Sequence, residues 1–342
     1  MKFLIAGLGS IGERHLKNLK SLYDCEILAY RVIERDRNDL VKKYGVKSLR
    51  DLKEALDLRP DGVLVTNPTS LHIPVALASA RRECNLFIEK PLSHQLDGVL
   101  ELERIVHEKD LVCLVGCNFR FHPGLMKIKS FLEEGRIGKV LSARIEAGEY
   151  LPDWHPREDY REGYSAKNSL GGGAILTLIH EIDYAYWFFG LPEKVFAFAE
   201  KLSPLQMDVE DTAEILLKFS DEKIVEIHLD YLQRSPSRSC QIIGEEGTIL
   251  WDYQKNQVEL FTAKNRNWQI FPGEKCFERN QMFLEEMRHF VSVVEGREKP
   301  QVTLKDGIEV LKIALAAKES AREGKVVKIS GSSVATPVVT GS

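Results

Sequence analysis

Lys90 is the first residue of this sequence whose type and position suit it to chemistry. It follows an apolar run, 85–88, and Glu89, and it precedes Pro91. An ammonium group with three donors can hold a substrate hydroxyl or stabilise an alkoxide. A solvated surface lysine is the ordinary alternative, but a place at the end of a predicted strand, before a proline of fixed φ, makes Lys90 the leading catalytic candidate.

His180 is the second candidate. It follows three glycines, 171–173, in a segment with helical period. An imidazole pKa near 6.5 suits a general base, and Asp183, one turn later, would orient it or restore its proton. On a continuous helix, Thr177 would share the same face. The alternative interpretation is a hydrogen-bonded core histidine and an aspartate on the helix surface.

An aromatic and polar segment, 150–164, lies between these two candidates in the sequence. Stacking rings and bonding side chains of this kind could line a sugar pocket, and the segment could equally be a solvated connection between domains. The substrate-binding candidates are Arg120, His155, Tyr160, Tyr164, Thr177 and His180.

A glycine-rich turn near the N-terminus predicts a nucleotide site. A short apolar run leads into Gly7-Leu8-Gly9-Ser10-Ile11-Gly12, and a helix-like segment follows at once. In a dinucleotide site, such glycines allow the tight turn, the approach of the backbone to the pyrophosphate and the packing of helix on strand, while the helix N-terminus offers free N–H groups. Three glycines alone also fit an ordinary structural turn, so the prediction depends on the strand and helix around them.

The end of the second predicted strand bears on the choice of dinucleotide. NAD-preferring sites carry an acid about 20 residues past the glycines, which bonds the ribose hydroxyls. Here the matching positions are Arg31 and Val32, and a guanidinium can hold a 2′-phosphate by charge-assisted bonds. We therefore predict NADP in preference to NAD. The alternative is an exposed Arg31, with Glu34 reaching the ribose.

Strand and helix patterns alternate over residues 1–117, which predicts a doubly wound parallel sheet. Open sheets of this class bind ligands at the carboxyl ends of their strands. Three such ends carry polar groups: Asn67-Pro68, Glu89-Lys90-Pro91 and Asn118-Phe119-Arg120.

Beyond residue 118, strand-like runs follow one another without helices between them, which predicts a large, mostly antiparallel sheet. We therefore predict an α/β protein with three parts: a dinucleotide-binding Rossmann domain over 1–118, a substrate-binding and oligomerisation domain over 119–329, and a flexible tail of small and polar residues over 330–342. An open sheet leaves one face free to meet a partner, which predicts a homo-oligomer.

Composition excludes several classes of function. A net charge of -4 over 342 residues argues against nucleic acid, which requires a basic face. No segment resembles a membrane span or a secretory signal, so we expect a cytoplasmic protein. The six cysteines form no paired motif, and we expect no metal site.

Taken together, several motifs resemble the Gfo/Idh/MocA family of sugar and cyclitol oxidoreductases. They are the glycine turn, Asn67-Pro68-Thr69-Ser70-Leu71-His72, Glu89-Lys90-Pro91, Gly116-Cys117-Asn118-Phe119-Arg120-Phe121-His122-Pro123 and the glycine-rich segment ending in His180. The resemblance implies that Lys90 is the catalytic lysine, that a cis bond precedes Pro91, and that His180 is the catalytic histidine. It also implies dimers or tetramers formed through the second sheet. It places residues near Asn67, His72, Glu89 and Asn118 at the nicotinamide or its ribose. The full set that we expect at the cofactor is Gly7, Gly9, Ser10, Ile11, Gly12, Arg31, Asn67, Pro68, His72, Glu89, Lys90 and Asn118.

One position departs from the family pattern. The family commonly has an aspartate four residues before the histidine, whereas this sequence has Leu176 and Thr177. His180 would then act with Lys90 and Asp183, or the site would favour reduction of a ketone.

The function these expectations favour is an NAD(P)-dependent interconversion of a secondary alcohol and a ketone on a sugar, cyclitol or nucleotide sugar. Two alternatives stay open. One is a redox-neutral, NAD-dependent glycosidase on the same fold, and the other is a non-catalytic nucleotide-binding sensor.

Overall fold

Short apolar runs, buried along nearly their whole length, form the first of two sheets. In the computed structural model, which describes residues 1–32, 38–154 and 158–329, six strands are all parallel in the order β3-β2-β1-β4-β5-β6. The strands are β1 Lys2–Ala6, β2 Glu26–Tyr30, β3 Lys47–Leu49, β4 Gly62–Val65, β5 Asn85–Glu89 and β6 Cys113–Gly116. The helices that connect them are α1 Ser10–Leu22, α2 Asn38–Lys43, α3 Leu52–Asp57, α4 His72–Arg81 and α5 Val99–Glu108. This confirms the doubly wound Rossmann sheet, and β3, which has no buried residue, is the strand that the sequence did not predict.

Alternating buried and exposed residues form the second sheet. Its nine strands lie in the order β14-β13-β12-β11-β7-β10-β9-β8-β15, and every pair is antiparallel except β7 with β10. The strands are β7 Val140–Gly148, β8 Lys194–Glu200, β9 Thr212–Lys218, β10 Ile224–Asp230, β11 Ser237–Gly244, β12 Gly247–Asp252, β13 Gln257–Thr262, β14 Trp268–Pro272 and β15 Val327–Lys328. The large, mostly antiparallel sheet is thus confirmed, with β14 and β15 as edge strands beyond those predicted.

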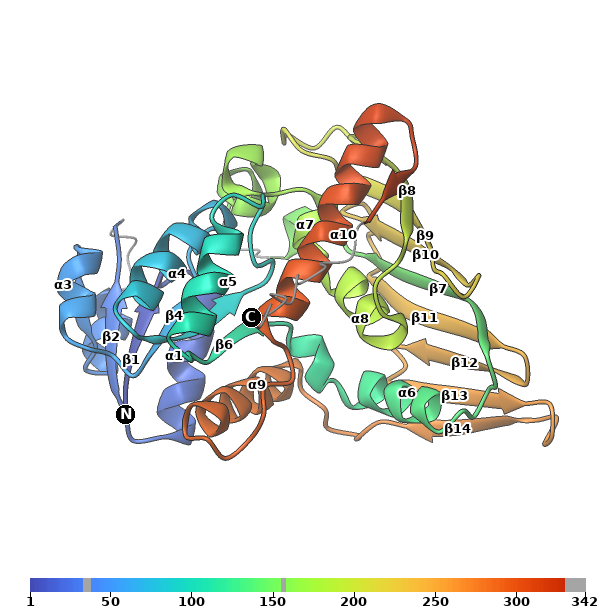
Figure 1. Ribbon diagram of the computed structural model, residues 1–342, viewed down its shortest axis with the longest axis horizontal. Coiled ribbons are helices and arrows are strands. Elements are labelled where there is room, and N and C mark those ends of the chain that lie inside the picture. The colour runs from blue at the N-terminus through green and yellow to red at the C-terminus, as the bar shows by residue number, and fades with distance from the viewer. Residues whose placement is uncertain (33–37, 155–157, 330–342) are drawn as a thin grey trace, which may run out of the picture.

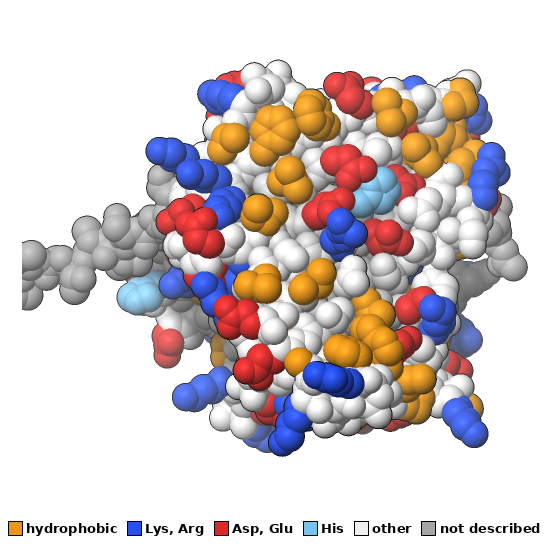
Figure 2. Space-filling model, turned by 90° about the vertical axis from the view of Figure 1, so that its right-hand side faces the viewer, with side chains coloured by type: hydrophobic (Ala, Val, Ile, Leu, Met, Phe, Trp, Pro, Cys, Tyr) orange, Lys and Arg blue, Asp and Glu red, His pale blue; other side chains and the backbone are white. Residues whose placement is uncertain are grey.

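Among the described residues, helices cover only one face of this second sheet. The helices α6 Pro123–Glu133, α7 Ala174–Thr177, α8 His180–Phe189 and α10 Leu304–Glu323 lie between the two sheets (Figure 1). The opposite face is uncovered, and hydrophobic side chains lie on it among acidic and basic ones (Figure 2). Among the exposed apolar side chains of its strands are Phe198, Leu216, Ile224 and Ile270.

The helix α9 Arg279–Val294 departs from the simple order of the two domains. It comes late in the chain but packs against α1, and its Phe290 contacts the rings of Phe3 and Phe87 from the first sheet. Residues assigned by sequence to the second domain therefore complete the hydrophobic core of the first. The 3-10 turn η2, Asn118–Phe121, follows β6 after Cys117, at the position where we predict the boundary between the two domains.

None of the helices in the described part of the chain combines the length and the apolar character needed to span a bilayer.

Candidate active site

The glycine turn between β1 and α1 has the geometry of a dinucleotide cradle. Gly7 has φ +107°, and a Cβ there would lie 2.7 Å from the Asn67 backbone. A Cβ on Gly12 would lie 2.0 Å from the carbonyl oxygen of Gly7, so only glycine lets α1 approach the strand so closely. A Cβ on Gly9 would meet no atom within 4 Å, so the space above this residue is open.

This open space fits a nicotinamide dinucleotide. Gly9 is the N-cap of α1 and makes no side-chain cap, and Ser10 and Ile11 begin the helix, so the helix N-terminus is available to a phosphate. Two amide side chains at the neighbouring strand ends also have buried polar atoms without hydrogen-bond partners, namely Oδ1 of Asn67 and Nδ2 of Asn118. Buried polar atoms are normally paired, so these two suit a ligand. Pro68 lies beside Asn67 as the N-cap of the 3-10 turn η1, Thr69–Leu71.

Arg31 directly follows β2 and is largely buried. Its backbone N–H donates to Leu49, which fixes the chain at the end of the strand. The alternative of an exposed arginine therefore does not describe this position. Glu34, the other candidate for the ribose, lies outside the described residues.

Two residues expected at the cofactor have their polar atoms engaged within the protein. The ring nitrogens of His72 lie 2.9 Å from the carbonyl oxygens of Pro91 and Asn67, so the imidazole connects two of the strand-end loops. Burial lowers the pKa of His72. The carboxylate of Glu89 is 2.6 Å from Nε2 of His15 on α1 and accepts the backbone N–H of Lys90. The side chains of His72 and Glu89 therefore help to fix the loops at the strand ends.

Lys90 reaches the second domain across the gap between the two sheets. Its Nζ donates a hydrogen bond of 2.7 Å to the carbonyl oxygen of Thr177, and the bond that joins it to Pro91 is cis. The continuous helix expected over this segment is interrupted, because α7 ends at Thr177 and α8 begins at His180. The last carbonyls of a helix have no N–H partner within it, so the interruption leaves the Thr177 carbonyl available to Lys90.

His180 lies next to this contact, at the first turn of α8. It is 5% exposed, its Nδ1 has no hydrogen-bond partner, and its ring packs 4.8 Å from that of Phe119. Burial, followed by the charges of Lys90, Arg238 and Arg279, lowers the pKa of His180 well below its ordinary value. A neutral imidazole with an unused nitrogen can accept a proton. Lys90 thus bonds a carbonyl three residues before His180, and its charge acts on the imidazole.

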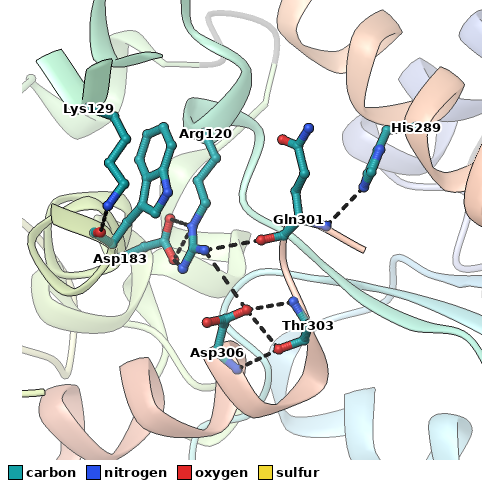
Figure 3. Close-up of polar contacts among 8 residues, drawn as sticks. Arg120, Lys129, Asp183, His289, Gln301, Thr303 and Asp306 are labelled. Atoms are coloured by element: carbon teal, nitrogen blue, oxygen red, sulfur yellow. Dashed lines mark hydrogen bonds and ion pairs between the residues drawn. The ribbon is translucent and has the colours of Figure 1, made fainter. Parts of the chain in front are cut away.

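Asp183 and Arg120 form a buried salt bridge with each other (Figure 3). The guanidinium donates to both carboxylate oxygens, at 2.7 to 3.1 Å, and also to the carbonyl of Gln301. Asp306 lies 3.9 Å away. Within the described parts of the chain, no hydrogen bond joins Asp183 to His180. The geometry therefore gives Asp183 and Arg120 a role in joining η2 to α8, in place of the expected contacts with His180 and with substrate.

The aromatic segment and the residues that follow it form a series of 3-10 turns: η3 Leu151–Asp153, η4 Tyr160–Glu162, η5 Tyr164–Ala166 and η6 Asn168–Leu170. The last of these packs against η1 at the strand ends of the first sheet. Tyr160 accepts a hydrogen bond from the backbone of Gln206, and Tyr164 is half-buried. His155 lies outside the described residues. The turn just after the segment, η6, thus contacts the strand-end loop η1 of the first sheet.

Sequence reasoning missed two groups beside the site. Arg238 of β11 and Glu181 of α8 form an ion pair of 2.9 Å next to His180. The second group consists of His15, Glu89 and Glu286. Each offers one atom that could bind a metal ion, and these atoms all lie within 4.8 Å of one another. Spacing along the chain gives no signal for either group, because each joins elements far apart in the sequence.

Comparisons with known proteins agree with this fold. Residues 1–117 match the model of an oxidoreductase family with an NAD-binding Rossmann fold, and residues 125–250 match that of the GFO/IDH/MocA C-terminal domain. The chain is 30% identical to myo-inositol 2-dehydrogenase of Thermotoga maritima, over 96% of this chain and 98% of that protein. It is 25% identical to scyllo-inositol 2-dehydrogenase (NAD(+)) of Bacillus subtilis, over 95% of each. Levoglucosan dehydrogenase in complex with NADH and levoglucosan shares the fold, with a TM-score of 0.86 at 20% identity over 97% of this chain and 100% of that chain.

Proposed function

This chain belongs to the Gfo/Idh/MocA family of oxidoreductases, and on that premise we propose that it interconverts a secondary alcohol and a ketone on a sugar or cyclitol. The observation that supports the proposal most is that the Lys90 ammonium, from the first domain, lies near the His180 imidazole, from the second. The Lys90 ammonium bonds the carbonyl of Thr177, three residues before His180, and its charge acts on the His180 ring. Such a pair at the cofactor edge of the first sheet can act on one substrate oxygen.

In the proposed oxidation, His180 accepts the hydroxyl proton at its neutral imidazole. Lys90 donates a hydrogen bond to the same oxygen and stabilises the negative charge that develops there. A nicotinamide dinucleotide, held at the glycine turn and by Asn67 and Asn118, would supply the hydride acceptor. The balance is one hydride to the dinucleotide and one proton to His180, which leaves the ketone. Asp183 is then a positioning residue, since its salt bridge fixes the helix that carries His180.

The experiment that tests these roles replaces Lys90 by methionine. Turnover should fall at least 100-fold, because a lost transition-state donor typically costs about 10²–10³, while the dissociation constant for the dinucleotide stays within a few-fold. Lys53→Met, at an exposed lysine of α3, is the matched control. A Lys90→Met enzyme with more than a tenth of the wild-type rate would contradict the assigned role.

The same assay separates the two alternative functions. A redox-neutral glycosidase, in which the bound dinucleotide is reduced and reoxidised in each cycle, would release sugar without a net change in nicotinamide absorbance. A sensor would bind the dinucleotide and turn over no sugar, polyol or nucleotide sugar in the panel. Net reduction or oxidation of free dinucleotide supports the dehydrogenase.

We also propose that the enzyme prefers NADP(H) to NAD(H). The support is Arg31, a buried guanidinium at the end of β2 where an NAD site commonly carries an acid. NADPH should bind at least tenfold more tightly than NADH, and Arg31→Ala should remove the difference. Equal affinities in the wild type, or a preference for NADH, would overturn this proposal.

The uncovered face of the second sheet supports a further proposal, that the chain forms a homodimer or homotetramer through it. Phe198 is 63% exposed and Leu216 45% exposed on adjacent strands. Light scattering should give a mass of two or four chains, and Leu216→Asp should lower it. Leu100→Asp, at a 70% exposed position on α5, should leave the mass unchanged. A wild-type mass of one chain would refute the proposal.

A further inference from the structure

Arg238 lies on the wall of the site that carries His180. It belongs to β11 and pairs with Ala147 of β7, on the face of the second sheet that the helices cover. The centre of its guanidinium is 4.3 Å from the centroid of the Phe119 ring, and that ring is 4.8 Å from His180. The Arg238 side chain is 15% exposed. The stacked ring therefore fixes a guanidinium that is partly open to solvent, beside the proposed catalytic base.

The side chain of Arg238 donates no hydrogen bond to any group in the described part of the chain. Its Nε lies 2.9 Å from Oε1 of the fully buried Glu181, but the N–H is not aligned for a hydrogen bond. Across residues 1–32, 38–154 and 158–329 no hydrogen bond from the guanidinium to another group is found. A guanidinium has five N–H donors in a planar fork that matches a carboxylate or a phosphate, so this fork is available to a ligand.

Positive charge also exceeds negative charge around His180. Lys90, Arg238 and Arg279 all act on the imidazole. Of the acids close by, Asp183 is neutralised by Arg120 and Glu89 is bonded to His15. Glu181 is the one acid paired with these three cations in the described part of the chain. A cluster of charges of one sign attracts ligands of the opposite sign.

We propose that Arg238 binds an acidic group of the substrate, a carboxylate or a phosphate, and so selects acidic sugars over neutral ones. The inference rests on the proposed function only in taking His180 as the place of the chemistry. The carboxylate would come from a sugar acid, and the phosphate from a sugar phosphate or a nucleotide sugar. Arg238 is then a specificity-determining residue, because it contacts the substrate away from the oxygen that reacts.

The experiment compares matched pairs of ligands in the presence of the reduced dinucleotide. The probes are glucose, galactose and mannose, with the uronic acid, the 6-phosphate and the nucleotide diphosphate derivative of each. Affinity is measured by intrinsic fluorescence, so the result does not require turnover. At least one acidic member should bind tenfold or more tightly than its neutral parent, and the member that does so identifies the source of the charge. A panel in which no acidic ligand binds more tightly than its parent would overturn the inference.

Variants of Arg238 test the assignment itself. Arg238→Gln should remove the preference for the acidic ligand, raise its KM at least tenfold and leave the affinity for the neutral parent within a few-fold. Because this change leaves Glu181 buried without its counter-ion, Arg238→Gln combined with Glu181→Gln keeps the pair neutral and guards against a folding defect. Arg322→Gln, at an exposed arginine of α10, is the matched control. An acid preference that survives in the double variant would refute the role of Arg238.

The two proposals can fail separately. If neutral sugars are turned over and acidic ones neither bind nor react, the dehydrogenase proposal holds and the Arg238 inference fails. If acidic ligands bind through Arg238 and no ligand is oxidised or reduced, the inference holds and the proposed function fails.

Discussion

Replacing Asp183 by asparagine tests whether this carboxylate serves the fold or the chemistry of His180. Arg120 is 3% exposed and Asp183 0% exposed, and the shortest of their bonds is 2.7 Å. The substitution removes the carboxylate charge and leaves the guanidinium buried, with Asp306 at 3.9 Å as the nearest remaining acid of the described chain. Removing one partner of a fully buried pair costs about 3–5 kcal/mol. We expect the free energy of unfolding to fall by that amount.

The assay is urea unfolding followed by intrinsic fluorescence, which suits this site because the indole of Trp187 lies 5.8 Å from the Arg120 guanidinium. Replacing both partners together, Arg120→Met with Asp183→Leu, should recover most of the loss, because an apolar pair of similar volume needs no counter-ion. The reasoning would be refuted if Asp183→Asn changed stability by less than about 1 kcal/mol and lowered kcat at least 100-fold. That result would assign Asp183 to catalysis.

Three further changes have outcomes that follow from the structure. Burial, with the charges of Glu89 and Asp183, raises the pKa of Glu286 well above its ordinary value. The folded protein therefore binds the proton more tightly than the unfolded chain does, and wild-type stability falls as pH rises between the ordinary and the raised pKa, by about 1.4 kcal/mol for each unit between them. The stability of Glu286→Gln does not fall in this way, so the Tm of the variant minus that of the wild type should increase from pH 5 to pH 8. A Tm difference that stays constant over this range would show that Glu286 is ionised in the folded protein. Because the pKa of His180 is lowered, kcat/KM should fall on the acidic side only at pH values below the ordinary pKa of histidine. A fall near pH 6.5 that persists in His180→Ala would report the titration of another group. Gly12→Ala places a methyl group 2.0 Å from the Gly7 carbonyl oxygen, so dinucleotide affinity should fall at least tenfold, and an unchanged affinity would mean that the turn adjusts without cost.

Local patterns predicted most of the fold. The first sheet is evident from buried runs separated by helical periods, and α10 begins and ends where its capping threonine and terminal glycine stand in the sequence. The position of Lys90 at the carboxyl edge of the first sheet was predictable, because it follows a buried apolar run and the ends of parallel strands meet at one edge. These are properties of residues close together in the chain.

The rest depends on contacts between distant segments. The expected helix through Thr177 and His180 has no proline to mark its interruption, and the carbonyl it leaves for Lys90 is visible only when both domains are in place. The partner of Asp183 is 63 residues away in the chain. Arg238 looks like an ordinary polar residue in its sequence context, and only the register of β11 against β7 turns it toward Phe119 and His180.

Because α9 comes late in the chain but packs on the first sheet, the core of that sheet is complete only when α9 has been synthesised. Phe87 is synthesised about two hundred residues before Phe290, and Phe3 nearly three hundred residues before it, yet Phe290 contacts both of them. A fragment that ended after β6 would leave these rings exposed to water, and the nucleotide-binding module would lack part of its own interior. A fragment cut at this apparent boundary would therefore lack the Phe290 contacts, which can form only after nearly the whole polypeptide has been made.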